Sequence, residues 1–341
     1  MAKPPVVDIH AHFYPESYMQ VLAQHGYSPG TIYSDAAPAD ASSKSAHTYK
    51  RPDPAFTDIA QRIAAMDSQG VTVQALSIPS PWIFWKDDTL AVKLAHAYND
   101  AASAAHIAHP NRLVGLITLP MHDANLALTE LDRASRLPGM RGVALGTHAA
   151  GRELSDRMFF PVYERISALG LPIFLHYAPL MVIGGNDRLK QFQLGNLIGN
   201  AVETAIAAAH LIFGGVFDTF PALEVCLPHA GGVLPILIGR WDQGYRVRNE
   251  CKHVPHSPSY YLRRFTYDTV SHSDLIMEYL VKLVGADRIM LGSDYCFDMG
   301  YERPVEMVER LAVITDRERE QILGATAARL LALGWVRLIW L

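Results

Sequence analysis

The sequence has few cysteines, no long apolar run and no cluster of basic residues. These absences argue against a disulfide-rich protein, a membrane protein and a nucleic-acid-binding protein. Three cysteines in 341 residues are too few for a disulfide framework and are typical of a reducing cytoplasm. The formal charge of −4 comes without a basic run, so nucleic acid is not an expected partner. We see no signal peptide and no run as long as a membrane span. We therefore expect a cytoplasmic protein that works away from the membrane.

The composition is that of a protein with a large buried core. Hydrophobic residues make up 50% of the chain and charged residues 19%, which excludes intrinsic disorder. A chain of this length suits one large domain or two ordinary ones. No linker or low-complexity segment divides the sequence, so we expect a single domain over residues 1–341.

Short apolar runs alternate with amphipathic helical patterns along nearly the whole chain. Runs that are apolar on both faces and separated by helices are typical of a parallel sheet. Eight such runs predict an α/β protein, a (β/α)8 or TIM barrel. An open doubly wound sheet is the alternative, but its glycine-rich phosphate turn after the first strand is missing. The runs are residues 6–12, 72–79, 112–120, 140–148, 172–178, 223–232, 265–272 and 289–297.

Two insertions account for the surplus length. Residues 16–51 separate the first strand from its helix, and residues 178–196 follow the fifth strand. Long connections in compact domains are usually functional. The first insertion leaves the carboxyl end of a strand, which is where barrel active sites lie, so we predict that it forms a lid or pocket wall.

Histidines and one aspartate stand where the expected strands end. His10 and His12 lie one residue apart in the first run, so on a strand both side chains project to the same face. Alone, this pair also fits two polar residues where a strand meets solvent. His176 lies near the end of the fifth run and Asp294 lies in the eighth. In a barrel these four side chains would converge at the carboxyl ends of the strands, at the mouth of the barrel.

Three imidazoles and one carboxylate form a donor set that suits a divalent metal. With these ligands and water in an open position, Zn²⁺ forms a catalytic rather than a structural site. Manganese and iron stay open as alternatives. Individually, His176 could be a satisfied core histidine and Asp294 a helix cap. The four residues together favour ligation.

The sequence resembles the amidohydrolase superfamily over nearly its whole length, and within it the decarboxylase branch typified by aminocarboxymuconate-semialdehyde decarboxylase. The resemblance is carried by DIHAHFYP, MDSQGVTVQALSIPS, RLVGLITLPM, GVALGTH, FLHYAP, GGVFDTFPALEVCLPHAGG and GSDYCF. It implies that His10, His12, His176 and Asp294 are the metal ligands. It also implies that His229 is the catalytic acid/base, placed beside the metal-bound water.

Further residues point by resemblance to one metal and to an anionic substrate. The fourth strand lacks the lysine that, carbamylated, bridges two metals in binuclear members, which leaves His229 free for proton transfer. Arg240 and Arg248 match a pair that in the family's decarboxylases reaches the pocket of a neighbouring subunit, which implies a homodimer. Arg51 (or Lys50) resembles the basic residue that holds a substrate carboxylate. On a helical pattern, however, arginines are also common in salt bridges on a solvated face.

The resemblance implies a metal-dependent, non-oxidative decarboxylase of a conjugated or aromatic carboxylic acid, active in aromatic catabolism without an organic cofactor. Trp82 and Trp85, just past the second strand, could form a wall for a flat substrate. The alternative is hydrolysis of an amide or lactone bond, because fold and ligands do not fix the reaction. A third hypothesis is a non-catalytic barrel that keeps a metal for structure or binding.

Overall fold

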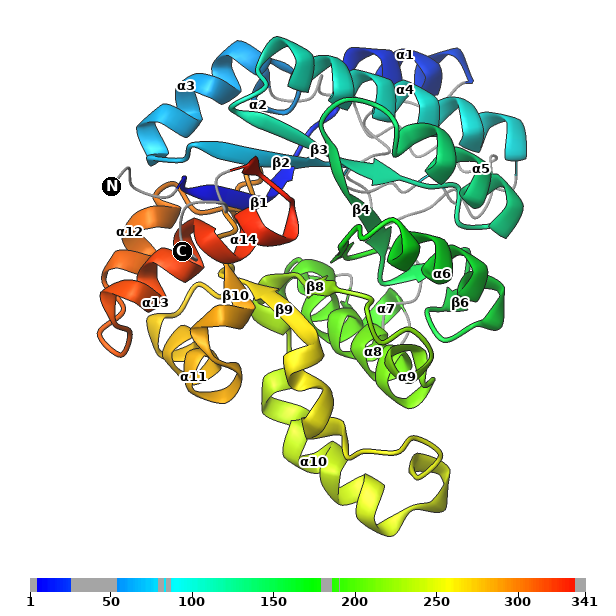
Figure 1. The fold of residues 1–341 in the computed structure, drawn as a ribbon, viewed down its shortest axis with the longest axis vertical. Helices are drawn as coiled ribbons and strands as arrows, with labels where there is room; N and C mark the ends of the chain where they lie inside the picture. Colours follow the sequence, from blue (N-terminus) through cyan, green and yellow to red (C-terminus); the bar gives the residue numbers. More distant parts are fainter. Residues whose placement is uncertain are drawn as a thin grey trace.

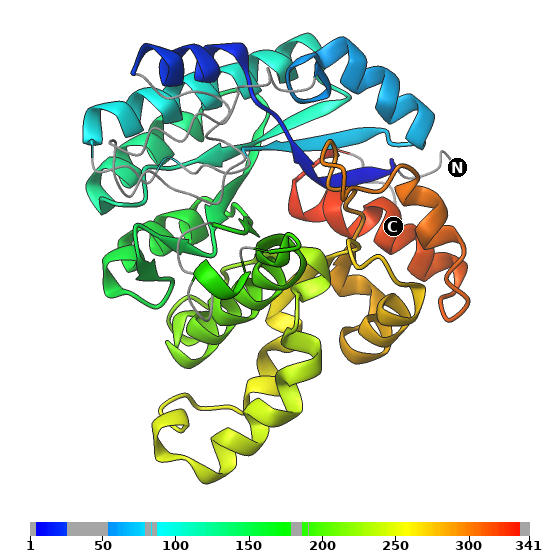
Figure 2. The ribbon, with the colours of Figure 1, turned by 180° about the vertical axis from the view of Figure 1, so that it is seen from behind.

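Eight parallel strands form a barrel with helices on its outside (Figures 1 and 2). The computed structural model describes residues 5–25, 54–78, 83, 87–178, 186–189 and 191–334. The strands follow one another in the order β1-β2-β3-β4-β7-β8-β9-β10. Their bounds are β1 Val7–His12, β2 Val73–Ser77, β3 Leu113–Thr118, β4 Met140–Gly146, β7 Ile173–His176, β8 Val225–Leu227, β9 Phe265–Asp268 and β10 Ile289–Met290.

The first and last strands meet and close the barrel. The backbone N–H of Ile9 donates to the carbonyl of Leu291 at 2.9 Å, and that of Asp294 donates to the carbonyl of His10 at 2.8 Å. Ala11 adds a parallel bridge to Tyr295 just beyond β10. A closed parallel barrel has no free edge to aggregate. The predicted (β/α)8 fold is confirmed.

Helices cover the outside of the barrel, and α10 projects away from it (Figures 1 and 2). The α-helices are α1 Glu16–Gln24, α2 Pro54–Thr57, α3 Ile59–Gln69, α4 Asp88–Ala108, α5 Ala124–Ala134, α6 Phe160–Ala168, α7 Asn186–Leu189, α8 Asn200–Phe213, α9 Val216–Thr219, α10 Leu234–Val247, α11 Asp274–Val284, α12 Pro304–Glu309, α13 Asp316–Glu320 and α14 Thr326–Leu330. The short 3-10 and π helices are η2 Arg157–Phe159, η3 Gly195–Gly199, η4 His229–Gly231, η5 Asn249–Cys251, η6 Pro258–Arg264, η7 Ala286–Arg288 and η8 Gln321–Ala325.

Local capping residues explain where several of these helices begin and end. In α3 the Asp58 carboxylate accepts the backbone N–H groups of Ala60 and Gln61, which satisfies donors that have no partner in the first turn. The helix ends at Gly70, whose φ of 72° is the left-handed conformation that glycine adopts without a steric cost. The chain then enters β2, whose five residues are all buried. Burial on both faces is what the continuous apolar runs predict.

The two insertions are described only in part. Within the first, α1 packs against α4, where the Ser17 hydroxyl donates to the carbonyl of Ala97 at 3.0 Å. Residues 26–51 lie outside the described part of the chain, so the lid stays a prediction. The second insertion contains α7 and the first two residues of η3. A two-stranded hairpin that the sequence analysis does not anticipate, β5 His148–Ala149 and β6 Arg152–Glu153, follows β4.

One helical stretch in the described residues has the length and composition of a membrane span. It covers Gly195–Phe213, 19 residues in all. An 18-residue window within it has a mean hydropathy of 1.2, and 44% of that window is buried. The core helix of a soluble protein has the same properties, so this stretch is weak support for a membrane span. Its buried residues in α8 include Ala207, Ala208 and Leu211, which belong to the hydrophobic core.

Candidate metal centre and active site

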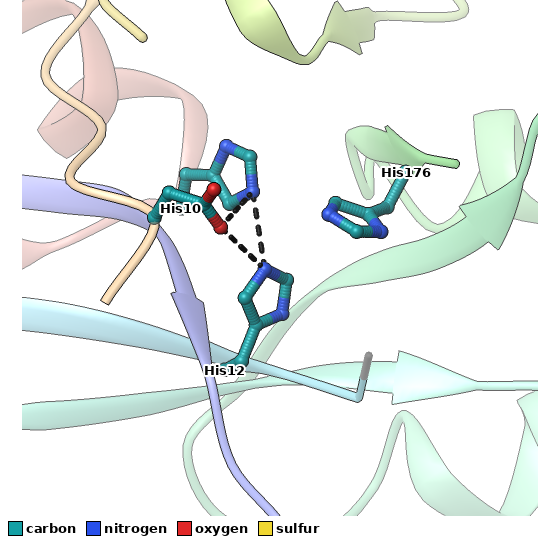
Figure 3. Close-up of side chains that lie close together, drawn as sticks. His10, His12 and His176 are labelled. Carbon is teal, nitrogen blue, oxygen red and sulfur yellow. Dashed lines mark hydrogen bonds and ion pairs between the residues drawn. The ribbon is translucent and has the colours of Figure 1, made fainter. Parts of the chain in front are cut away.

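The structure brings His10, His12, His176 and Asp294 together at the carboxyl ends of three strands. Each offers one ligand atom, and these four atoms all lie within 4.8 Å of one another. Figure 3 shows the rings of His10 and His12, from β1, and of His176, from β7, turned toward one space. Asp294 joins them from the loop after β10, with its Oδ1 at 3.0 Å from His12 Nε2 and 3.4 Å from His10 Nε2. Alternation along β1 is the reason that both histidines share this face.

The Nδ1 atoms of the two β1 histidines are held by residues from β9 and β2. His10 Nδ1 donates to the Asp268 carboxylate at 2.6 Å, and His12 Nδ1 lies 3.1 Å from the Ser77 hydroxyl. Since Ser77 Oγ donates to the carbonyl of Ala11, it accepts from His12 Nδ1. Both rings therefore present Nε2 to the centre of the cluster, which is the arrangement that prepares a histidine to ligate a metal.

Electrostatics in the cluster favour a bound cation. Burial disfavours the charged form of His10, but Asp294 and Asp268 outweigh it and raise the pKa of His10 to about 9. Burial lowers the pKa of His12 to about 4 and that of His176 well below its ordinary value. Burial also opposes the charged form of Asp294, but the histidines beside it keep its pKa low. At neutral pH the metal-free cluster thus carries one additional proton, on His10. That proton lies near His12 and Asp294, which are also candidate metal ligands.

His229 lies beside the cluster rather than within it. Its ring centroid is 5.3 Å from that of His10 and 5.6 Å from that of His176. In the described part of the chain its Nδ1 is buried and has no hydrogen-bond partner. Burial, followed by the charge of His10, lowers the pKa of His229, so this imidazole is neutral at pH 7. A neutral imidazole can accept a proton and give it back.

The turn that carries His229 is strained and is held by Asp268. His229 has a φ of 53° and Ala230 a φ of 54°, a left-handed conformation that non-glycine residues rarely adopt. The Asp268 carboxylate accepts the backbone N–H of His229 at 3.0 Å and that of Ala230 at 2.8 Å. Asp268 therefore orients both His10 and His229. The sequence analysis leaves this residue out of the site, although an aspartate within the seventh run could have indicated it.

Only two of the predicted substrate-binding residues, Arg240 and Arg248, are among the described residues, and neither lies at this site. Arg51, Trp82 and Trp85 lie outside the described residues, so their roles stay predictions. Arg240, on α10, and Arg248, which caps the end of α10, are exposed. Because α10 projects from the barrel (Figures 1 and 2), the end of this helix faces away from the chain's own cluster.

A small cavity of about 20 Å³ lies inside the barrel next to the cluster. His10, His176 and Asp268 border it on the polar side, and its other walls are mainly apolar. Donor chemistry, burial and ring orientation all fit a single divalent cation at the strand ends.

Comparison with known proteins assigns the chain to a family. Residues 7–333 match the amidohydrolase family. The chain is 30% identical over 331 residues to 2-amino-3-carboxymuconate-6-semialdehyde decarboxylase of Dictyostelium discoideum, covering 96% of this chain and 91% of the relative. It is 27% identical over 297 residues to gamma-resorcylate decarboxylase of a Polaromonas species, covering 80% and 87%.

A solved structure agrees with this assignment at the level of the fold. The 5-carboxyvanillate decarboxylase of Novosphingobium aromaticivorans, complexed with manganese and a nitrobenzoic acid, superimposes with a TM-score of 0.81 at 22% identity. The alignment covers 97% of this chain and 96% of that one. With a buried cluster of three histidines and one aspartate at the strand ends of a parallel barrel, this chain belongs to the amidohydrolase family, in its decarboxylase branch.

Proposed function

We propose that the protein is a carboxy-lyase, a metal-dependent and non-oxidative decarboxylase of a conjugated or aromatic carboxylic acid. The observation that carries the proposal is the His10, His12, His176 and Asp294 cluster with neutral His229 beside it. The decarboxylases among its relatives support this reaction over the hydrolysis of an amide or lactone.

We further propose that the chain forms one barrel domain, with residues 16–51 as its lid, and that it works in the cytoplasm. The three free thiols support that compartment.

The cation we propose is zinc, held by His10, His12, His176 and Asp294. Three imidazoles and a carboxylate suit Zn²⁺, while the manganese named for the Novosphingobium structure makes Mn²⁺ the competing choice. When bound, the cation would polarise the substrate and lower the pKa of water at the site. No organic cofactor is needed for this chemistry.

His229 would move the proton on which decarboxylation depends. The neutral imidazole accepts a proton and delivers it to the carbon that bears the carboxylate. The bond between that carbon and the carboxylate then breaks, its electron pair returns to the conjugated system, and CO2 leaves. The product carries hydrogen where the substrate carried the carboxylate. Asp268 fixes the His229 backbone, and so helps to hold the ring at the distance from the cluster that this transfer requires.

Carbon dioxide release by the metal-analysed protein tests the proposal. We expect CO2 from aminocarboxymuconate semialdehyde or from a hydroxybenzoic or carboxyvanillic acid, lost on chelation and restored by zinc or manganese. Comparing the two metals at equal occupancy identifies the one that supports turnover. Hydrolysis of an amide or lactone with no CO2 from any acid would overturn the decarboxylase and keep the metal site.

We also propose that the enzyme is a homodimer in which Arg240 and Arg248 reach the partner's pocket. Exposed apolar side chains accompany the arginines on and beside α10, including Ile236 (66% exposed), Val247 (63%) and Tyr260 (58%). Apolar groups mixed with arginine are typical of the centre of a protein interface. An α10 that projects from its own barrel could extend over the partner.

Mixing of inactive subunits tests the role of Arg248 across subunits. We expect Arg248→Ala to lower kcat/KM by about 10²-fold, because a charge-assisted contact to the substrate carboxylate is lost. Pairing Arg248→Ala with His229→Ala subunits at equal amounts should restore about a quarter of wild-type activity, since half of random dimers are mixed and each has one complete site.

The matched control is Arg246→Ala. This arginine lies on the same exposed end of α10 and bonds only to Gln243 of its own helix among the described residues. Its loss should leave kcat/KM within about twofold. Mixtures of tagged, co-expressed Arg248→Ala and His229→Ala chains that remain inactive would contradict the cross-subunit site.

A further inference from the structure

A fully buried carboxylate, Asp8, lies two residues before His10 on β1, and both of its oxygens accept hydrogen bonds. One oxygen accepts the backbone N–H of His10 at 3.1 Å and that of Ser293 at 3.0 Å. The other accepts the Ser293 hydroxyl at 2.6 Å and the Gln74 side-chain amide at 2.8 Å. Four donors around two oxygens favour the ionised form of the carboxylate, while burial acts against it and raises the pKa of Asp8.

These contacts join two of the chain segments that carry the candidate ligands. His10 is itself a candidate ligand, and Ser293 immediately precedes Asp294. One oxygen of Asp8 therefore spans the backbone of β1 and the backbone of the loop after β10. Hydrogen bonds from both backbones to one buried oxygen leave little freedom for either segment to shift.

A buried arginine holds the carboxyl end of β1 through the same chain of contacts. Arg62, on α3, is fully buried and donates to the Gln74 amide oxygen at 2.7 Å. Its other terminal nitrogen donates to the backbone carbonyl of His12. Its guanidinium also lies 4.9 Å from the centroid of the Tyr295 ring, next to Asp294.

Gln74 lies between the carboxylate of Asp8 and the guanidinium of Arg62 and bonds to both. Its NH2 end donates to the Asp8 carboxylate and its oxygen accepts from the Arg62 guanidinium. An amide has one donor end and one acceptor end, and only that polarity satisfies both neighbours. Burying two charges in this way costs free energy that an apolar core would not, so the gain lies in fixed geometry.

We propose that Asp8, Gln74 and Arg62 are positioning residues that set the spacing of His10, His12 and Asp294 before a cation binds. The inference rests on the metal site of the proposed function and not on its reaction. Ligand atoms held at the right spacing in advance cost less to order on binding, so the chain should raise metal affinity.

Zn²⁺ affinity, measured in competition with a chromophoric chelator, tests the proposal. Gln74→Glu keeps the size of the side chain but turns an acceptor toward Asp8, so we expect the affinity to fall by about 10- to 100-fold. In the double variant Asp8→Asn with Gln74→Glu, the new amide at position 8 can donate to the new carboxylate at position 74, which still accepts from Arg62. The total charge is the same as in the wild type. It should recover most of the loss, which a merely destabilising change would not do.

Asn99→Asp is the matched control for placing an acid in a buried network. Asn99 is a fully buried amide that donates to Glu130 at 2.6 Å and to the carbonyl of Thr118 at 3.0 Å, away from every candidate ligand. We expect it to lower the melting temperature and leave Zn²⁺ affinity unchanged. Arg62→Lys provides a second test variant should Gln74→Glu fail to fold, and it should also lower the affinity.

Three results would overturn the inference: unchanged Zn²⁺ affinity in Gln74→Glu or Arg62→Lys, no recovery in the double variant, or an equal loss of affinity in Asn99→Asp. Wild-type protein that binds no divalent metal would instead overturn the metal site and with it the proposed function. Wild-type protein that binds Zn²⁺ but releases no CO2 would overturn the proposed reaction alone.

Discussion

The His229→Ala variant is expected to keep its metal and to lose about 10²- to 10⁴-fold in kcat, the usual contribution of a positioned proton donor or acceptor. The ring of His229 lies beside the cluster, 5.3 Å from His10 between centroids, and it is not among the four clustered ligands. Its lowered pKa keeps it neutral at pH 7 and ready to accept a proton. Metal content by elemental analysis and kcat from CO2 release are measured on the same sample.

Added imidazole separates proton transfer from a structural role of His229. A small imidazole that enters the space left in His229→Ala should restore part of kcat, with a pH dependence that follows the pKa of the added base. His229→Asn, which fills part of the space with a group that does not titrate, should stay inactive without it. Loss of the metal together with activity in either variant would make His229 a ligand and contradict its assignment as the proton carrier.

The second large effect concerns pH. Metal affinity is expected to rise about 100-fold between pH 6 and pH 8, because one proton must leave the metal-free site when the cation enters. The proton is on His10, whose pKa is raised to about 9 by Asp294 and Asp268 against the effect of burial. Below that pH the proton competes with the metal, so affinity grows up to tenfold per pH unit and levels off above it. His12, with a pKa of about 4, is already deprotonated over this range and adds nothing.

Calorimetry in buffers of different ionisation enthalpy measures the protons released. We expect about one per Zn²⁺ or Mn²⁺ bound at pH 7. Asp268→Asn removes the carboxylate that lies 2.6 Å from His10 Nδ1 and should lower the pKa of His10, so fewer protons are released at pH 8. Metal affinity that is the same at pH 6 and pH 8 would contradict the protonated His10.

The barrel and the clustered residues could be predicted from the sequence because short local patterns indicate both. Apolar runs between helices indicate buried parallel strands, and a histidine or aspartate at the end of a run marks the face where barrel loops converge. His10 and His12 need only the two-residue repeat of a strand to share a face. His176 and Asp294 follow from the same rule in distant runs, and the resemblance then identifies all four as metal ligands.

The residues behind the cluster could not be predicted because their partners are distant in sequence. Arg62 lies in an amphipathic helix, where an arginine is normally solvated, yet it is fully buried against the carbonyl of His12. Gln74 occupies a run that reads as apolar, and its partner Asp8 lies 66 residues away. Asp268 contacts His10 over a separation of 258 residues. Such contacts depend on how strands are arranged in space, which periodicity does not specify.

Closure of the barrel between its first and last strands has a consequence for biosynthesis. His12 and Asp294 meet across that seam, although 282 residues separate them in the chain. A ribosome delivers His10 and His12 well before Asp294, which follows His12 by 282 residues, so a nascent chain has two of the clustered side chains long before it can gather four. Cation loading must therefore follow the emergence of the final strand, and a chain cut short before residue 294 would keep most of its helices and strands but no complete centre.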